Sequence, residues 1–510
     1  MAANRRDFIR LTAATLAATA GVGAVAGTAG ASAGGESGAA NWAALRKHLT
    51  GDLVLPSDTG YDQAHQLSMG QFDVVRPRAV AYCESERDVQ TVLAFARDHA
   101  LHTVPRSGGH SFGGYSTSPG VVLDVSRLNQ VRVRPSTVVL GPGVQQVDAL
   151  EALSPLGLSL VGGLCPNVCA GGFLQGGGIG LGTRKFGMAS DRLVSASVVL
   201  ADGRTVRASE TEHPDLFWAL RGGGGGNFGV VTSYEVTPTR IPSIVNYNVG
   251  FPWDSAREVI RAWQHWIVDG SRDNGAALGI QYGDAGTGVP DVLAHGGWFG
   301  SKEELDKQLD AFVADVGLAP ISRSVEEKPY GDGMMEWYGC ADLTVKECHR
   351  VGYTPEAKLP RQNFSADRNR MYSEAIPDDG LDRMLAAFVA NRRSGQFRFL
   401  SFFALGGVAN EVDRSATAYV HRTTQFFAGF SLGLLDPAYT EEDRTTAVTW
   451  IDAAFDTLGA YSLHESYQNF IDPALVDWQK SYYDENYRRL AEVKRSYDPD
   501  RFFRFAQGIR

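Results

Sequence analysis

The apolar positions in the first part of the chain follow two different spacings. Residues 79–82 form a short apolar run, and the polar Ser85 then opens a segment whose apolar side chains recur at helical intervals as far as Phe95. A second apolar run covers residues 101–104. This pattern predicts a strand, a helix with a capping box at its start, and a second strand. The second strand ends directly in a glycine-rich stretch.

Similar runs predict further strands and helices along the rest of the chain. The length of 510 residues favours more than one domain. Up to residue 240 we expect strands at 121–124, 137–140 and 196–201 and a helix at 147–153. The middle region alternates strands (246–251, 275–282, 397–405) with helices (254–268, 302–316, 380–390). This alternation favours an antiparallel sheet backed by helices.

Glycine is concentrated in three stretches. The first reads Arg-Ser-Gly-Gly-His-Ser-Phe-Gly-Gly at 106–114, the second covers 163–180, and the third places five successive glycines at 222–226. Glycine lets the backbone adopt positive φ and approach a ligand closely, and successive N–H groups can bind an anion. Five glycines alone would suggest a flexible linker. Because an apolar helix and an apolar strand flank them, we expect a backbone cradle for a diphosphate.

The position of the first stretch matters, because it follows the second strand of its strand–helix–strand unit. The usual dinucleotide fingerprint, G-x-G-x-x-G, follows the first strand instead. A nicotinamide-type site is therefore a poor fit. The formal net charge of −10 and the pI of about 5.6 also argue against a nucleic-acid partner, which would require a basic face.

The N-terminal residues predict export. Arg5 and Arg6 precede an alanine-rich, weakly apolar segment at 11–29, and residues 31–33 provide a small-x-small cleavage site. Paired arginines indicate the twin-arginine (Tat) route, so residues 1–33 are predicted to be a signal peptide read by the Tat export machinery. The segment is too weakly apolar to favour a membrane anchor. We expect a secreted protein.

The five cysteines fall into two groups. Cys340 and Cys348 are close together in one loop and, outside the cell, predict a local disulfide. A zinc site made by these two with His349 is the alternative, but it lacks the paired spacing of structural zinc sites, so we predict no metal. Cys83, Cys165 and Cys169 remain as an odd set.

Together, the three glycine stretches and the C-terminal segment at 482–504 resemble the berberine-bridge-enzyme-like branch of the vanillyl-alcohol-oxidase flavoproteins. The resemblance implies an α+β fold with a two-part, PCMH-type FAD-binding domain at 41–240 and a substrate-binding domain at 241–459. Residues 460–510 would return to the FAD-binding domain. It also implies an FAD-dependent oxidoreductase that acts on a small-molecule substrate, uses O2 as acceptor and works as a monomer.

The resemblance also places the cofactor. His110 is implied to bond the 8α-methyl group of FAD, and Cys165, in Cys-Pro-Asn-Val at 165–168, is implied to bond flavin C6. A bridge from Cys165 or Cys169 to Cys83 is the structural alternative. Val168 stands where the family's oxygen-gating residue lies, which favours oxygen access. The other predicted cofactor-binding residues are Arg106, Ser107, Gly108, Gly109, Ser111, Gly113, Gly114, Gly171, Gly172, Gly176, Gly177, Gly178, Asp191, Asn227, Gly229, Val230 and Asn486.

The substrate site departs from the family pattern. Members that oxidise sugars and alkaloids often have tyrosines where this chain has Phe112, Ile179 and Phe470. Tyr467 remains as the candidate base, with Asn469 as the second candidate catalytic residue. A tyrosine base requires a pKa lowered from its usual value near 10, and the alternative is a core tyrosine packed beside the flavin. For His421, a buried structural role is favoured over that of a base.

The three missing hydroxyl groups favour an aromatic or polycyclic substrate, because a sugar requires several hydrogen bonds. We therefore predict a hydride transfer from an alcohol, an amine or a reduced ring to flavin, which O2 then reoxidises to give H2O2. One alternative is oxidation of an oligosaccharide at its anomeric carbon. Another is a flavin-bearing protein that sequesters a toxic metabolite.

Overall fold

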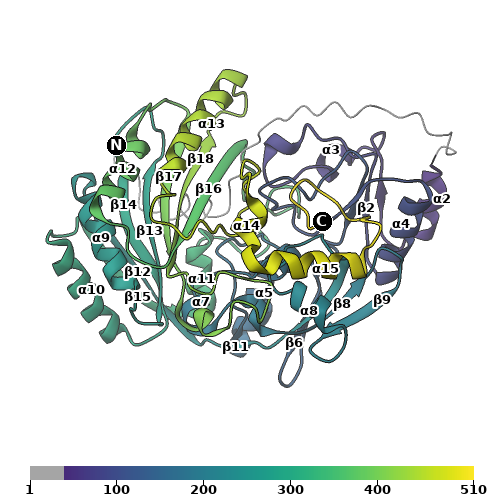
Figure 1. Ribbon diagram of the computed structural model, residues 1–510, viewed down its shortest axis with the longest axis horizontal. Coiled ribbons are helices and arrows are strands. Elements are labelled where there is room, and N and C mark those ends of the chain that lie inside the picture. Colours follow the sequence, from purple (N-terminus) through teal and green to yellow (C-terminus); the bar gives the residue numbers. More distant parts are fainter. Residues whose placement is uncertain (1–39) are drawn as a thin grey trace.

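The computed structural model describes residues 40–510, so the predicted signal peptide at 1–33 lies outside the described residues. Two halves lie side by side, each built on its own β-structure (Figure 1). The first half holds two larger sheets and one two-stranded sheet from residues 53–240, and the second half holds a single large sheet. The mixed α+β architecture agrees with the sequence-based expectation.

The first sheet of the first half presents the glycine-rich loop at 106–114. Its order is β1-β2-β4-β3, in which β2 (Ala79–Tyr82), β4 (Val121–Asp124) and β3 (Thr103–Arg106) run parallel and β1 (Leu53–Val54) pairs antiparallel. Helix α4 (Glu86–Asp98) connects β2 to β3, and the side chain of Ser85 caps it by accepting from Asp88 N. Shorter helices are α2 (Trp42–His48), α3 (Tyr61–Ala64) and η1 (Gly70–Phe72).

The second sheet of this half is antiparallel, with the order β5-β6-β10-β8-β9. Its strands are β5 (Val131–Val133), β6 (Val138–Leu140), β10 (Val230–Val236), β8 (Leu193–Val199) and β9 (Thr205–Ser209). The strand that the sequence predicts at 196–201 corresponds to β8, which begins three residues earlier and ends two residues earlier. The helices here are α5 (Gln146–Leu153), α6 (Ala170–Gln175), α7 (Thr183–Phe186) and α8 (Pro214–Ala219), and the short β7 (Leu158–Ser159) pairs with β11 (Thr239–Arg240).

The second half is an antiparallel sheet in the order β15-β12-β14-β13-β17-β18-β16. The strands are β12 (Ser243–Phe251), β13 (Asn274–Tyr282), β14 (Asp291–Trp298), β15 (Ser322–Pro329), β16 (Phe364–Tyr372), β17 (Gln396–Ala404) and β18 (Phe426–Leu434). Helices α9 (Ala256–Ile267), α10 (Lys302–Val316), α12 (Asp378–Val389) and α13 (Glu441–Asp456) pack with one face of the sheet in a single apolar core. Helix α11 (Tyr330–Trp337) contacts β12 and β15.

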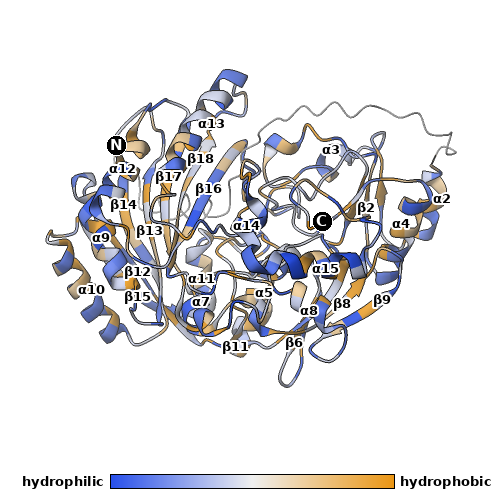
Figure 2. Ribbon diagram, viewed as in Figure 1, coloured by the Kyte–Doolittle hydropathy of each residue, from blue (hydrophilic) through white to orange (hydrophobic). Residues whose placement is uncertain are grey.

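The other face of this large sheet is turned toward the first half. Phe399, Phe403 and Phe427 pack in one cluster with Ile179 of the first half and with Tyr467. Apolar residues occur in the strands of both halves, whereas many exposed helix positions are polar (Figure 2). Most strands of the large sheet are therefore buried on both faces, with α9, α10, α12 and α13 on one face and with the first half and helix α11 on the other.

The C-terminal segment returns across the first half, where α15 (Tyr487–Tyr497) lies beside α8 (Figure 1). It follows the short helices α14 (Trp478–Tyr483) and η6 (Asp484–Asn486). Within α15, the buried Lys494 donates from Nζ to Asn227 O at 2.6 Å and to Asp498 Oδ2 at 2.7 Å. A buried ammonium group must be paired, so Lys494 fixes the end of the chain against the five-glycine loop.

A strap at residues 340–362 connects the two halves. The Cys340–Cys348 disulfide, with Cα atoms 5.8 Å apart, confirms the predicted bridge. His349 does not join these sulfurs in a metal site, because its Nε2 is 2.9 Å from Asp148 Oδ1. Farther along, Arg361 pairs with Asp73 at 2.6 Å. Among residues 40–510, no group of three or more His, Cys, Asp or Glu side chains is placed to hold a metal ion.

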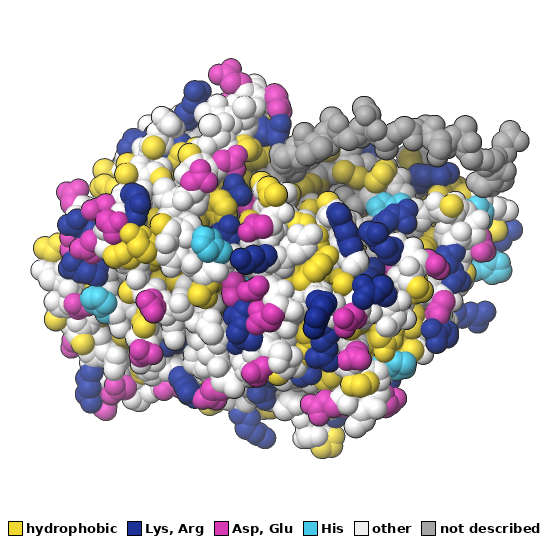
Figure 3. Space-filling model, viewed as in Figure 1, with side chains coloured by type: hydrophobic (Ala, Val, Ile, Leu, Met, Phe, Trp, Pro, Cys, Tyr) yellow, Lys and Arg dark blue, Asp and Glu magenta, His cyan; other side chains and the backbone are white. Residues whose placement is uncertain are grey.

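Positive and negative side chains are mixed over the face shown in Figure 3. Within the described part of the chain, no helix combines the length and apolar character needed to cross a membrane.

We expect the strap disulfide to stabilise the fold. Replacing both Cys340 and Cys348 by serine frees a short loop in the unfolded chain and should lower the free energy of unfolding by about 2–3 kcal/mol. Thermal unfolding of purified wild-type and double-variant protein, followed by circular dichroism without reductant, would measure the difference. Identical unfolding temperatures would show that the bridge does not constrain the chain.

Candidate active site

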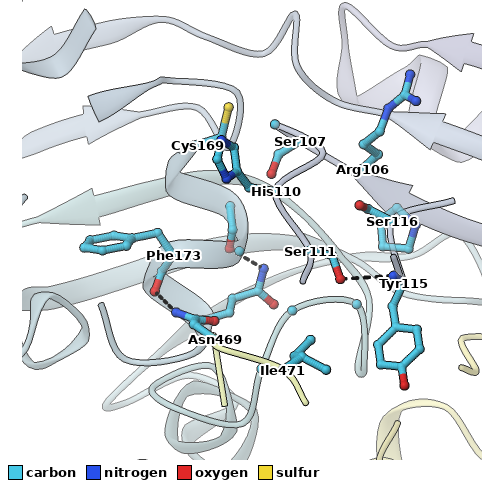
Figure 4. A pocket seen from close by; sticks show the side chains of 18 of the residues that line it. Arg106, Ser107, His110, Ser111, Tyr115, Ser116, Cys169, Phe173, Asn469 and Ile471 are labelled. Carbon is cyan, nitrogen blue, oxygen red and sulfur yellow. Dashed lines mark hydrogen bonds between the residues drawn. The ribbon is translucent and has the colours of Figure 1, made fainter. Parts of the chain in front are cut away.

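One cleft in the first half gathers the glycine-rich stretches and the C-terminal segment. Of the residues predicted to bind cofactor or substrate, it is lined by Arg106, Ser107, Gly108, Gly109, His110, Ser111, Cys165, Val168, Gly171, Gly172, Asn227, Gly229, Val230, Tyr467 and Asn469. Figure 4 shows His110 and Ser111 on the loop after β3, Phe173 in helix α6 with Cys169 directly before that helix, and Asn469 and Ile471 entering from the C-terminal segment. Residues more than 350 positions apart therefore meet at one site.

The remaining predicted residues lie outside the lining of the cleft and support its walls. Asp191 accepts from both Arg422 Nη atoms, at 2.6 and 2.8 Å. Asn486 donates to Arg414 O and Thr417 O. The others are glycines that allow close packing behind the wall, namely Gly113, Gly114, Gly176, Gly177 and Gly178. For example, Gly114 has φ +69° and leaves no room for a Cβ beside Phe72.

The five-glycine loop is a fixed cradle rather than a linker. Gly222, Gly224 and Gly226 have φ of 122°, 83° and 76°, values that favour glycine. Asn227 closes the loop, because its Nδ2 donates to Gly223 O and Gly224 O at 3.1 and 3.2 Å. The loop therefore presents its backbone to the cleft in one conformation.

The cleft suits a dinucleotide cofactor such as FAD. A Cβ built on Gly172, which lines the cleft, would meet no atom within 4 Å. The space in front of this backbone is thus open, as a bound diphosphate requires. Ser116 Oγ and Arg106 Nη1 also belong to lining residues and are buried without a hydrogen-bond partner in the protein. Buried polar atoms of this kind are expected to bind a ligand or water.

His110 is held in place from the second glycine stretch. Its Nε2 lies 2.7 Å from Oδ1 of Asn167, and because an amide oxygen only accepts, Nε2 carries the hydrogen. Sequence analysis did not select Asn167, since nothing in the pattern around it signals a contact with a loop 57 residues away.

The three remaining cysteines are buried, and none of them forms a disulfide within residues 40–510. This overturns the alternative in which Cys83 bridges Cys165 or Cys169. Cys83 packs in a separate apolar cluster beside β2 and α4. Cys165 and Cys169 both line the cleft, where burial raises the pKa of each thiol well above its ordinary value. The Cys169 thiol donates to Gly143 O at 3.3 Å, so its proton is engaged by the protein.

Tyr467 is buried and its oxygen receives two hydrogen bonds. Gly178 N donates to it at 2.9 Å and Asn469 Nδ2 at 3.0 Å. The second hydrogen of Asn469 Nδ2 donates to Phe173 O at 3.0 Å, which fixes the orientation of the amide. Burial raises the pKa of Tyr467 above its usual value, although the hydrogen bonds from Asn469 and Gly178 oppose that rise. Tyr467 is therefore a neutral phenol at neutral pH, and it must ionise before it can act as a base.

The positions where the family often has tyrosines form an apolar wall. Phe112 stacks on Phe470 with ring centroids 5.3 Å apart, and Phe470 contacts Tyr467 edge-on at 5.0 Å. Phe427 of the large sheet meets Phe470 at 5.6 Å. Ile179 is 3% exposed and packs in the same cluster as Tyr467. The wall offers aromatic contact and few hydrogen bonds.

His421 has a supporting role. Its Nδ1 is 2.6 Å from Glu465 Oε2, and its Nε2 is 3.0 Å from Gln468 Oε1. Because Gln468 Nε2 donates to Gly222 O at 2.7 Å, the amide oxygen faces the ring, and both ring nitrogens must donate. A ring that donates at both nitrogens has no lone pair with which to act as a base. Gln468, which sequence analysis did not select, carries this network to the cleft.

Two families of known domains match the chain. The FAD binding domain family matches residues 77–209, and the berberine and berberine-like family matches residues 466–510. These ranges contain the His110 loop and Tyr467, respectively.

Several known proteins are similar over most of the chain. An uncharacterised FAD-linked oxidoreductase of Bacillus subtilis, YgaK, is 28% identical over 90% of this chain and 97% of its own length. The glucooligosaccharide oxidase of Sarocladium strictum is 29% identical over 84% of this chain and 86% of its own. A solved structure of the Acremonium strictum glucooligosaccharide oxidase, which carries 6-S-cysteinyl, 8α-N1-histidyl FAD, has a TM-score of 0.78 at 24% identity and covers 90% of this chain and 97% of that one.

These matches agree with the fold and with the cleft. The protein is an FAD-dependent oxidoreductase with a berberine-like C-terminal segment and the fold of the related FAD-binding oxidases.

We predict that Gly172→Val blocks cofactor loading without disturbing the fold. A Cβ at this position meets no protein atom within 4 Å, and the larger valine side chain takes up open space in the cleft. The matched control is Gly283→Val, because a Cβ on Gly283 also meets nothing within 4 Å and Gly283 does not line the cleft. Flavin content by absorbance and thermal stability would be measured for both. Full flavin content in Gly172→Val would show that the cofactor lies elsewhere.

Proposed function

We propose that the protein is a secreted oxidase that removes a hydride from an alcohol, an amine or a reduced ring of an aromatic or polycyclic substrate and releases H2O2. One observation carries the choice of substrate. Phe112, Phe470 and Phe427 form a continuous aromatic wall next to Tyr467. Such a wall binds a flat apolar molecule by contact area, whereas a sugar would leave its hydroxyl groups unpaired there.

Bound FAD supplies the hydride acceptor and the site of reaction with O2. The chain's part is to hold the cofactor and to position the substrate. The five-glycine loop and Gly171–Gly172 would bind the diphosphate through the backbone. Val168 lines the cleft, and its small side chain supports access of O2.

His110 and Cys165 are the proposed covalent anchors. Because Nε2 of His110 donates to Asn167, we assign the linkage to Nδ1. This agrees in kind with the N1-histidyl FAD of the Acremonium strictum oxidase. Cys165 is proposed as the second anchor, because it lines the cleft and stands in the Cys-Pro-Asn-Val sequence at 165–168. A covalent link would keep the cofactor on a protein that works outside the cell.

Tyr467 is the proposed base: in its ionised form it would accept the proton of the substrate's reacting N–H or O–H, and because burial raises its pKa, the ionised fraction grows as the pH rises. Its phenolate would be stabilised by the two N–H donors that already point at its oxygen, Gly178 N and Asn469 Nδ2. This arrangement resembles an oxyanion hole, in which fixed donors favour the charged form. Asn469 therefore positions Tyr467 and helps it to ionise.

Export is proposed from two observations. Residues 1–33 have the pattern of a Tat signal, and the Cys340–Cys348 disulfide is typical of an oxidising compartment. The Tat route carries folded proteins, which suits a chain that must first load FAD. We propose that the exported protein is a monomer.

A second candidate function is the oxidation of oligosaccharides. The similarity to a glucooligosaccharide oxidase over 84% of the chain supports it. A third is sequestration of a metabolite by the flavin-bearing protein, which would shift the flavin absorbance on binding without producing peroxide.

A substrate panel separates these functions. We expect aromatic alcohols, amines and reduced heterocycles to bleach the flavin absorbance in anaerobic stopped-flow experiments and to release peroxide in air. Cello- and xylo-oligosaccharides should do neither. Bleaching by the oligosaccharides alone would establish the second function, and spectral shifts without bleaching would favour sequestration.

Replacing Tyr467 by phenylalanine should reduce the rate of flavin reduction by about 10²–10⁴-fold, because the proton acceptor is lost. Asn469→Ala removes a hydrogen bond that lowers the pKa of Tyr467, so the rise in kcat/KM should move to higher pH. Tyr419→Phe is the matched control, since Tyr419 is a buried neighbour with ring centroids 6.3 Å from Tyr467 that does not line the cleft. An unchanged pH profile in Asn469→Ala would contradict the proposed role.

The anchors can be tested by denaturation. In the wild type, flavin should stay with the chain after acid precipitation, and peptide mass spectra should place it on His110 and Cys165. His110→Ala should weaken the attachment, and Cys165→Ala should leave a single histidyl link. Cys169→Ala is the control expected to keep both bonds. Attachment through Cys169 would contradict the assignment.

A further inference from the structure

One buried acid on the large sheet has no role in the site described so far. It is Asp367 in the edge strand β16. Alternate residues of this strand face opposite ways: Ala366 and Tyr372 pack in the helix-covered core, whereas Met371 packs with Tyr467. Asp367 and Asn369 share the parity of Met371, so they face the cofactor-binding half.

The neighbours of Asp367 connect it to the active-site wall. In the register of the sheet it stands opposite Ser431, whose Oγ donates to Asp367 Oδ2 at 2.6 Å. Asn369, the next residue on the same face, accepts from the backbone N of Tyr467 at 3.2 Å. Asp367 is therefore the neighbour, on the same face of β16, of Asn369, which binds the backbone of Tyr467.

Asp367 makes no salt bridge within the described part of the chain. The neighbouring arginines of β16 face the other way, where Arg368 pairs with Asp472 and Asp452 at 2.7 Å each. Burial raises the pKa of Asp367 to about 7, against hydrogen bonds from Ser431 and Asn369, and the negative charge of Asp472 adds to the rise. Buried acids are normally paired with a cation, so an unpaired one in this position calls for a cationic ligand.

Aromatic rings continue the same face of the sheet. Ser431 stands opposite Phe399 of β17, and Phe399 belongs to the cluster that contains Phe403, Phe427 and Tyr467. In the next row, Gly429 stands between Ser401 of β17 and Asn369 of β16. A carboxylate at the end of an aromatic strip is the arrangement that binds an aromatic ammonium ion, by charge pairing and by cation–π contact.

We propose that Asp367, with Ser431, anchors a protonated amino group of the substrate, so that the preferred substrates are aromatic or polycyclic amines. This inference rests on the proposed oxidase function and narrows its substrate class. Asp367 acts in recognition, at a group of the substrate apart from the reacting bond, and takes no part in hydride transfer. Its replacement should therefore affect binding rather than the chemical step.

The test uses a pair of probes of the same shape, tryptamine and its neutral analogue tryptophol. Binding to the flavin-loaded protein is measured from the change in flavin absorbance without turnover. At pH 8 tryptamine should bind at least about 10-fold more tightly than tryptophol, as expected for a desolvated charge pair. Tryptamine affinity should rise between about pH 6 and 8 as Asp367 loses its proton, while tryptophol affinity stays constant.

Asp367→Asn should remove the preference for tryptamine and its pH dependence and leave tryptophol binding unchanged. The matched control is Asp452→Asn, which alters the ion pair of Arg368 on the opposite face. Asp367→Asn also removes a buried acid without a counter-ion, so its unfolding temperature above pH 7 should not fall. This measurement separates lost recognition from lost folding.

Equal affinity of the two probes, or no detectable binding of tryptamine, would overturn the proposal. An equal loss of both probes in Asp367→Asn would do so too. Failure of the oxidase function gives a different result, because the binding preference would then persist in a protein whose flavin no substrate bleaches.

Discussion

The active site depends on the way Asn227 holds the five-glycine loop open. Its side-chain amide ties the loop to itself through Gly223 O and Gly224 O, and its Oδ1 accepts from Ile509 N at 2.9 Å. Its carbonyl accepts from the buried Lys494. The five-glycine loop and the C-terminal segment thus both bind Asn227. Without these bonds, glycine backbone would be the least ordered part of the molecule.

Polar and aromatic side chains have different roles around the cleft. Polar side chains behind the wall, such as Glu465, His421 and Gln468, are saturated by one another and by backbone groups. Phe112 and Phe470 line the cleft, and Phe427 packs against Phe470. Polar groups that bond to one another give rigidity without competing for the substrate. The polar groups left to recognise a substrate are then the Tyr467 hydroxyl and, in our proposal, the carboxyl group of Asp367.

Much of this arrangement could be predicted from the sequence. The spacing of apolar residues gave helix α10 the bounds it has in the structure, and the loop position of Cys340 and Cys348 gave the disulfide. Patterns within one segment carry such information, because propensity and spacing are local. Of the second glycine stretch, Gly163, Gly171 and Gly172 line the cleft, whereas Gly176–Gly178 and Asp191 do not.

Other features could not be predicted, because they depend on contacts between distant segments. Strand β16 carries Asp367, Arg368, Asn369 and Arg370 in succession, so it has no alternation of apolar and polar residues to mark it as a strand. Asn167 and Gln468 are ordinary polar residues until the fold places them beside His110 and His421. The alternative of a disulfide from Cys83 was wrong for the same reason. Cys83 packs in a separate apolar cluster, and spacing along the chain does not show this.

The most direct test of this account is the visible absorption spectrum of the protein purified in its native state. The account predicts a yellow protein with stoichiometric flavin whose colour is lost anaerobically on addition of an aromatic reductant substrate and returns in air. A folded but colourless protein that takes up no FAD would contradict the central claim that the glycine-lined cleft is a flavin site.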